Sequence, residues 1–221
     1  MPINPPRVRV HASAPSIQFS KSRRRKTRRV RERFQKKKND LNDNDIILFQ
    51  DEASIQFAPT IIRMWSLKGH QPEILTYGGR KRQHLIGAFK PLARRFHIAF
   101  SEAMKVKQFE HFLEGLLARY KNAGKILLIL DNARAHHSKE LEPFLKVNEE
   151  KLELMFLPPY SPSMNPMEWF WKFLRKKVTH NTFFGTFKEF QRAMIKFIIK
   201  FKLSSQEIKT RCSFSKIFNS L

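Results

Sequence analysis

The chain has 221 residues, enough to bury one core, and its 43 Lys and Arg residues against 19 Asp and Glu give a formal net charge of +24. This excess of cations predicts a polyanionic partner, with nucleic acid as the first candidate and a membrane surface as the second. No apolar run reaches the roughly 18 residues of a spanning helix, and the start MPINPPRVRV lacks the apolar segment of a signal peptide. A single cysteine, Cys212, excludes an internal disulfide and a zinc cluster. One cysteine suits a reducing compartment, so we expect a cytoplasmic protein.

Residues 1–42 form a basic leading segment. Its middle, from Lys21 to Lys38, stacks like charges with few apolar anchors. We expect a disordered tail that becomes helical only on DNA. The alternative is a solvated tail with no specific role.

From Ile46 onward short apolar runs alternate with turns, which predicts a folded domain over residues 43–182. The run from Ile46 to Glu52 predicts a buried strand that ends in carboxylates. Two further strands joined by a turn are predicted at His84–Pro91 and Arg95–Ser101.

Helices and strands alternate in the second half of the chain. The predicted elements are a helix at Lys105–Lys121, a strand at Lys125–Ala133 ending in an acid, a short helix at Ser138–Lys146, a strand at Leu152–Pro158, a helix that holds Glu168, and an amphipathic stretch at Phe187–Phe201 within a helical extension, 183–221. A strand meander followed by strand, helix, strand and helix predicts an α/β fold, a mixed sheet with helices packed on it.

Three acids from distant parts of the chain are predicted to meet at one end of this sheet. Ligands of open α/β sheets gather at the carboxyl ends of strands, where Asp51 and Asp131 fall, and Glu168 opens a late helix. Three carboxylates without counter-charge repel one another, so divalent cations would fill the gap between them. Mg²⁺ prefers oxygen ligands, and two ions roughly 3.5–4 Å apart would serve an in-line displacement at phosphorus.

Three stretches of the chain, FQDEAS, LILDNARAHHS and LPPYSPSMNPMEWFWKFLR, carry a family resemblance. They resemble the three motifs of DDE transposases in the mariner-like superfamily, specifically the prokaryotic insertion-sequence family numbered six hundred and thirty. The resemblance covers residues 46–178. The motifs occur in order, with 79 residues between Asp51 and Asp131 and 36 between Asp131 and Glu168.

The resemblance implies an RNase H-like fold, a mixed five-stranded sheet flanked by helices, in which Asp51, Asp131 and Glu168 are the catalytic, metal-binding acids. It implies two Mg²⁺ or Mn²⁺ ions as cofactors and double-stranded DNA, both element ends and target, as the partner. The implied reaction is strand cleavage followed by attack of the freed 3′-hydroxyl on target DNA, by a homodimer in the synaptic complex. Such a protein would be associated with the nucleoid, with no membrane partner.

Four other residues are expected to support the acids or to bind DNA. The resemblance assigns Asn132 and His136 to the local network of the second motif. Lys172 and Arg175 follow Glu168 by one and two helical turns and are expected to face phosphate. A histidine in a basic loop is as often a phosphate contact or a capping group, so a catalytic role for His136 stays one of several hypotheses.

Glu168 has a structural interpretation as well. Asn165 can be the N-cap of its helix and Pro166 the first helical residue, which puts Glu168 at the third position, where it can complete a capping box. Its partner acids favour the metal-binding role over the cap.

The other two acids also have alternatives. Asp131 followed by Asn132 is ordinary turn chemistry. Asp51 has Glu52 beside it, and strand alternation sends neighbours to opposite faces, so one of them joins the site and the resemblance selects Asp51.

Two other functions stay open from the sequence. A structure-selective nuclease or RNase H on the same fold would cut without joining. A DNA-binding transposase remnant would bind DNA without needing a metal. The family places helix-turn-helix modules before the catalytic domain, and the residues before Ile46 are too few to hold them.

Overall fold

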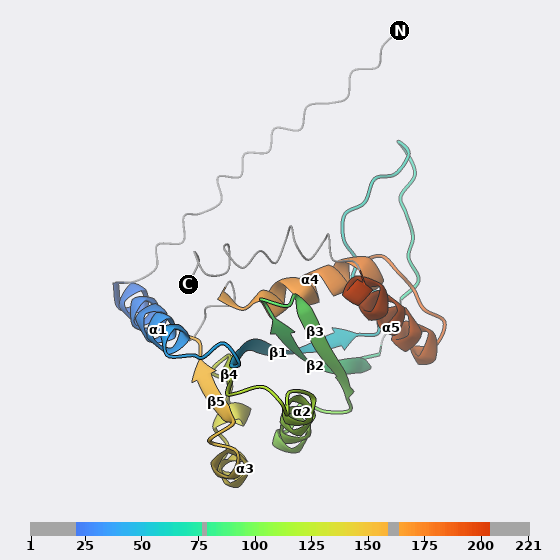
Figure 1. Ribbon diagram of the computed structural model, residues 1–221. Coiled ribbons are helices and arrows are strands. Elements are labelled where there is room, and N and C mark those ends of the chain that lie inside the picture. Colours follow the sequence, from blue (N-terminus) through green and yellow to red (C-terminus); the bar gives the residue numbers. More distant parts are fainter. Residues whose placement is uncertain (1–20, 77–78, 159–163, 204–221) are drawn as a thin grey trace.

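The computed structural model describes residues 21–76, 79–158 and 164–203, and a five-stranded mixed sheet forms its centre (Figure 1). The strands are β1 (Ile46–Gln56), β2 (Arg82–Lys90), β3 (Arg95–Ser101), β4 (Ile126–Leu130) and β5 (Leu152–Phe156), in the order β3-β2-β1-β4-β5. The first three pair antiparallel, whereas β1, β4 and β5 run parallel. The mixed sheet predicted from the element order is therefore confirmed.

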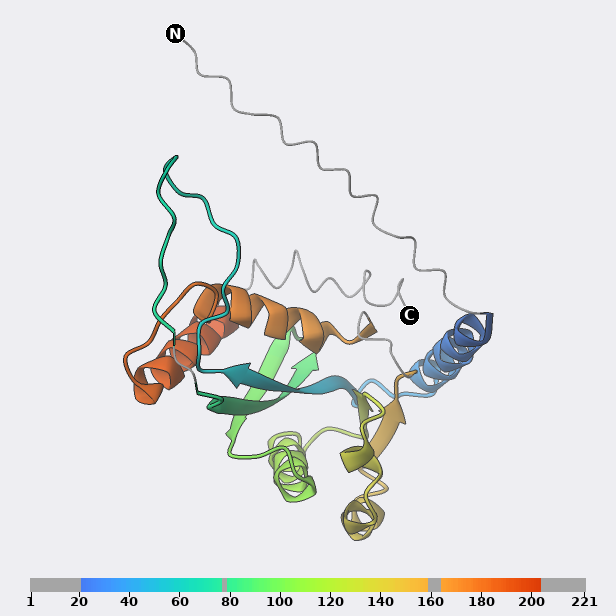
Figure 2. The same cartoon turned by 180° about the vertical axis from the view of Figure 1, so that it is seen from behind.

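Helices cover both faces of the sheet, as the two opposite views in Figures 1 and 2 show. They are α1 (Lys21–Asn39), α2 (Val106–Arg119), α3 (Glu142–Val147), α4 (Pro166–Val178) and α5 (Phe187–Leu203), with 3₁₀ turns η1 (Arg134–His137) and η2 (Lys139–Leu141). The predicted short helix at Ser138–Lys146 thus begins as a 3₁₀ turn and continues as α3.

Strand alternation divides the core into two faces. On β1, Phe49 belongs to one face and Leu48 to the other, because successive side chains point to opposite sides. The Phe49 face is covered by α1, α4 and α5, and the Leu48 face by α2, η2 and α3. Aromatic rings fill the α4 and α5 side, where Phe96 stacks on Phe170 at 4.8 Å between ring centroids.

Strand β1 is longer than the sequence predicted. It continues past Asp51 to Gln56, because β2 pairs with it through Gln56↔Arg82. The expectation that Asp51 ends its strand is therefore wrong. Parallel pairing with β4, however, runs only to Phe49↔Ile129, so Asp51 lies just beyond the point where β1 and β4 separate.

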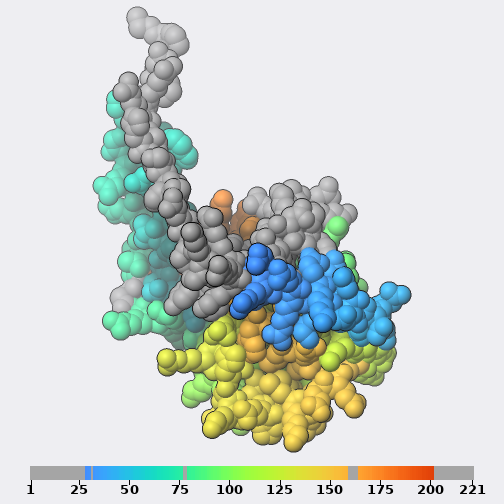
Figure 3. Space-filling view, turned by 90° about the vertical axis from the view of Figure 1, so that its left-hand side faces the viewer, coloured from blue at the N-terminus to red at the C-terminus, as the bar shows by residue number. Residues whose placement is uncertain are grey.

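The expectation of a disordered basic tail is also corrected over Lys21–Asn39, which form α1. Phe34 supplies the missing anchor: it is 1% exposed, packed among apolar side chains of β1, β4 and β5. An ion pair of Lys37 with Glu153 ties the end of the helix to β5. Figure 3 shows blue α1 lying against the yellow and orange segments. Residues 1–20 lie outside the described part.

Helix α5 shares its core with α4. Phe190 and Phe201 are buried there, so the start of the predicted C-terminal extension packs on the sheet domain. Residues 204–221 of that extension are outside the described residues. The boundaries at 42 and 182 stay predictions. Among the described helices, none combines the length and the apolar character needed to cross a membrane.

The β1–β2 connection projects from the body as a long loop, seen in Figures 1 and 2. Its base is fixed to the end of α4: Thr60 bridges His180, and Asn181 exchanges hydrogen bonds with the backbone of Ile62 at 2.8 and 3.1 Å. Within this loop, Trp65 is fully exposed.

Candidate active site

The parallel register of β1 and β4 brings Asp51 and Asp131 to one place. Ile46 pairs with Ile126 and Phe49 with Ile129. Continuing that register by two residues, beyond the last pair, brings Asp51 of β1 level with Asp131, which follows the end of β4. Backbone pairing alone therefore brings two of the three predicted acids together.

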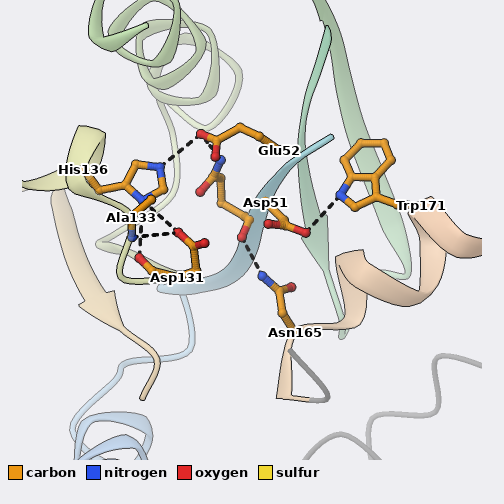
Figure 4. Close-up of polar contacts among 8 residues, drawn as sticks. Asp51, Glu52, Asp131, Ala133, His136, Asn165 and Trp171 are labelled. Carbon is orange, nitrogen blue, oxygen red and sulfur yellow. Dashed lines mark hydrogen bonds and ion pairs between the residues drawn. The ribbon is translucent and has the colours of Figure 1, made fainter. Parts of the chain in front are cut away.

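Asp51 is a buried carboxylate held by a tryptophan. Its side chain lies on the α4 face and is 9% exposed, and Trp171 Nε1 donates a hydrogen bond to its Oδ2 at 3.1 Å (Figure 4). Opposite it in the β2 register is Gly87, where a Cβ would approach Met167 Cε at 2.5 Å and Trp171 at 2.9 Å. Glycine here lets α4 pack closely enough for Trp171 to reach the acid.

The charge on Asp51 is uncompensated. Burial raises the pKa of its carboxyl, and the nearby carboxylates of Glu168, Glu52 and Asp131 raise it further, to about 8. Trp171 supplies a single neutral donor, which is too little to offset three like charges. A cation among these acids would favour the ionised form, so the group of acids is suited to one.

Asp131 is oriented by a buried histidine. His136 is 2% exposed, in η1, and its Nδ1 lies 3.2 Å from Asp131 Oδ1, while its Nε2 lies 3.0 Å from Glu52 Oε1. Burial opposes a charge on His136, but its contacts with Asp131 and Glu52 outweigh burial and raise its pKa to about 10. An imidazolium donates from both nitrogens, so His136 links the two acids across the sheet edge (Figure 4).

The consequence for Asp131 is a carboxylate kept ionised. The hydrogen bond from His136 and the 3.1 Å bond from the backbone of Ala133 lower the pKa of Asp131, against the opposing effect of burial. Phe109 of α2 packs on the His136 ring at 4.5 Å between centroids and fixes its position.

Glu168 stands at the start of α4, where the helix cap is made by Asn165. The Asn165 side chain accepts a hydrogen bond from Met167 N at 3.0 Å and donates one to the carbonyl of Gln50 at 2.7 Å. This pair of bonds locks the first turn of α4 to β1, one residue before Asp51. Within the described residues, the Glu168 carboxylate has no hydrogen bond, so the capping box that competed with a metal role is not formed.

The remaining predicted residues take different positions. Asn132 is exposed and its Oδ1 contacts His137 Nε2 at 2.5 Å. Lys172 is exposed and Arg175 half-buried on α4, and neither has an ion pair among the residues that the structure describes. Both are free to meet an anion, and their role in DNA binding stays a prediction.

The three acids fit divalent metal chemistry by their type and by the excess negative charge around Asp51. All are carboxylates, the oxygen ligands that Mg²⁺ and Mn²⁺ accept. Over the described ranges, no group of three His, Cys, Asp or Glu side chains has a geometry that could hold an ion, since Asp51 and Asp131 turn toward protein donors.

Two contributors are absent from the predicted site. Trp171 donates to Asp51 and follows Glu168 by three positions, so helical spacing alone signals that the two share a face. Glu52 supports the site through its bond to His136. No sequence signal pairs Glu52 with a residue 84 positions away.

Comparisons with known proteins follow the same line. Residues 46–191 match the family described as DDE superfamily endonuclease, which is well over half of the chain. The insertion element IS630 uncharacterized 39 kDa protein of Shigella sonnei is 31% identical over 135 residues, 61% of this chain and 39% of that protein. The uncharacterized protein y4pE/y4sA of Sinorhizobium fredii (strain NBRC 101917 / NGR234) is 41% identical over 63 residues, 28% of this chain and 43% of that protein. The match therefore spans about two fifths of the length of each relative.

Solved structures share the fold. The mariner Mos1 paired end complex with Mg has a TM-score of 0.67 at 16% identity, covering 97% of this chain and 65% of that chain. The catalytic domain of Mos1 mariner transposase has a TM-score of 0.58 at 12% identity, covering 90% of this chain and 96% of that domain. This likeness confirms the predicted RNase H-like fold. With its family match spanning the sheet, both aspartates and α4, the chain belongs to the DDE superfamily endonucleases.

Proposed function

We propose that this chain is the catalytic domain of a transposase that cleaves DNA strands and joins them to target DNA with the help of divalent metal. The observation that carries the proposal is the buried Asp51 carboxylate, whose pKa is raised to about 8 by burial and then by the charges of Glu168, Glu52 and Asp131. A structural acid would be paired with a basic side chain of the protein. Asp51 has no such ion pair among the described residues, and its surroundings favour a bound metal cation instead. The DDE family match gives the reaction class.

Asp51, Asp131 and Glu168 would hold two Mg²⁺ or Mn²⁺ ions. When bound, such ions supply activation of the attacking oxygen and stabilisation of the leaving oxygen at phosphorus. The protein's own contribution is positioning. Trp171 orients Asp51, and Asn165 ties the start of α4, and with it Glu168, to β1.

His136 holds Asp131 in its ionised form from the other side of the sheet edge. Lys172 and Arg175 would neutralise phosphates of the bound DNA. The Mos1 paired-end complex with left transposon end and the Mos1 Strand Transfer Complex, which share the fold, support transposon-end DNA as a substrate. Handling two ends together favours a homodimer, and the DNA substrate favours association with the nucleoid.

The test is a combined cleavage and strand-transfer assay on a labelled duplex carrying the end of the flanking element, with Mg²⁺ or Mn²⁺. We compare the wild type with Glu168→Gln, and use Glu142→Gln, an exposed acid at the start of α3, as the matched control. The proposal expects cutting and joining by the wild type and the control, and neither by Glu168→Gln. Cutting without joining would indicate a nuclease, and binding without either would indicate a remnant.

A further inference from the structure

A small cationic pocket lies at the opposite face of the sheet from Asp51. Its volume is about 200 Å³, and its walls come from the start of β3, the turn before it and the end of α2. The lining residues are Arg94, Arg95, Phe96, His97 and Arg119. Three arginines around one cavity on a chain of net charge +24 are a candidate anion site.

The pocket is assembled from three elements rather than from one flexible segment. His97 Nε2 lies 2.6 Å from the hydroxyl of Tyr120, which ties β3 to the end of α2 and brings Arg119 beside β3. Lys90 pairs with Arg95 in the β2–β3 register, and its Nζ lies 5.2 Å from the centre of the Tyr120 ring. The fold therefore brings the backbone segments that carry these cations together, and the three arginine side chains are exposed there.

Among the residues that the structure describes, no ion pair joins Lys90, Arg94, Arg95 or Arg119 to a carboxylate. Burial, and then the charge of Arg95, hold the pKa of Lys90 below its usual range. An anion in the pocket would relieve this repulsion.

Arg94 stands where the backbone favours glycine. The turn that joins β2 to β3 closes with a hydrogen bond from Arg94 N to Pro91 O at 3.1 Å, and Arg94 has φ of 52°, in the left-handed region. Hairpins of this kind usually place glycine there, because a side chain is disfavoured in that conformation. The turn geometry does not favour arginine over glycine at this position, and the Arg94 side chain lines the pocket.

We propose that this pocket binds a backbone phosphate of DNA, at a contact separate from the catalytic acids. Guanidinium groups suit phosphate oxygens because their planar N–H groups bind two oxygens at once. Lys90 and Arg95 share the strand face of Ala88, which packs toward α2, whereas Gly87 faces α4 and the Asp51 side. The bound phosphate is therefore not the one being cleaved, and the contact positions DNA without reading its sequence.

This inference rests on the proposed function, since it takes DNA as the ligand. The test measures binding of the full chain to a 30-base-pair duplex of arbitrary sequence by fluorescence anisotropy, in EDTA, across 50–200 mM NaCl. The variants are Arg94→Gly and Arg119→Ala. Lys146→Ala, which removes one charge from an exposed site on α3, is the matched control.

One lost phosphate contact lowers the salt slope by about 0.9, which corresponds to roughly eightfold weaker binding at 0.1 M salt. We expect this loss for Arg94→Gly and Arg119→Ala and not for Lys146→Ala. Because glycine relaxes the turn, Arg94→Gly should keep the wild-type unfolding midpoint in urea, which separates lost contact from lost structure.

The outcomes distinguish the two proposals. If the wild type binds the duplex and Arg94→Gly and Arg119→Ala match the control in affinity and slope, the pocket is not a phosphate site and the proposed function stands. If the wild type does not bind duplex DNA at all, both are overturned.

Discussion

Replacing Asp51 by asparagine should make the metal-free protein more stable, and increasingly so as the pH rises. The exchange keeps the size of the side chain but removes a buried carboxyl whose pKa is raised from 3.8 to about 8. The folded state holds this proton more tightly than the unfolded state does. The stabilisation is therefore fully present below pH 4 and is lost as the pH rises through 8.

The magnitude follows from the same values. Each pKa unit corresponds to about 1.4 kcal/mol, so between pH 5 and pH 7 the wild type should lose about 3 kcal/mol of unfolding free energy relative to Asp51→Asn. Other titrating groups are common to both proteins and largely cancel in the difference.

The assay is urea unfolding followed by tryptophan fluorescence in EDTA at pH 5, 6, 7 and 8, repeated in Mg²⁺. In Mg²⁺ the wild type should recover stability at high pH, whereas Asp51→Asn should respond far less. A stability difference that does not change with pH would refute the claim that Asp51 is an uncompensated buried acid.

Three further predictions concern packing around the site. Gly87→Ala should cost about 1–3 kcal/mol of unfolding free energy in urea, because its methyl group would press on the fully buried Met167 and Trp171. Gly115→Ala, which has open space around it in α2, should instead gain roughly 0.5–1 kcal/mol. An equal effect for both would contradict the packing argument. Phe34→Ala should cost about 3–5 kcal/mol because it empties the anchor of α1, and unchanged unfolding would show that α1 does not dock as described. Trp171→Phe removes the donor to Asp51 and should weaken Mn²⁺ binding measured by calorimetry, while wild-type affinity would count against an orienting role.

The sequence predicted most of what backbone pairing and periodicity determine. Short apolar runs marked all five strands, and Asp51 within β1 and Asp131 after β4 became neighbours because β1 and β4 pair in parallel. The end of β1 was misjudged because Asp51 and Glu52 are polar, whereas pairing with β2 carries the strand on to Gln56.

Two features depend on contacts that sequence patterns do not encode. The leading segment was expected to be disordered because of its charge, yet its part from Lys21 to Asn39 forms a helix that the buried Phe34 docks on the sheet. The link from Glu52 through His136 to Asp131 requires η1 to fold back beneath Phe109, which brings residues 84 positions apart into contact. Pairings of that separation come from the tertiary fold.

The central claim is that Asp51, Asp131 and Glu168 together hold the divalent ions. Its most direct test is Mn²⁺ binding to the full chain with a short duplex, counted by electron paramagnetic resonance, for the wild type and for Asp51→Asn, Asp131→Asn and Glu168→Gln. Unfolding in urea confirms that each variant is folded. The account predicts two ions bound to the wild type and the loss of at least one in every variant. Wild-type stoichiometry and affinity in all three variants would contradict it.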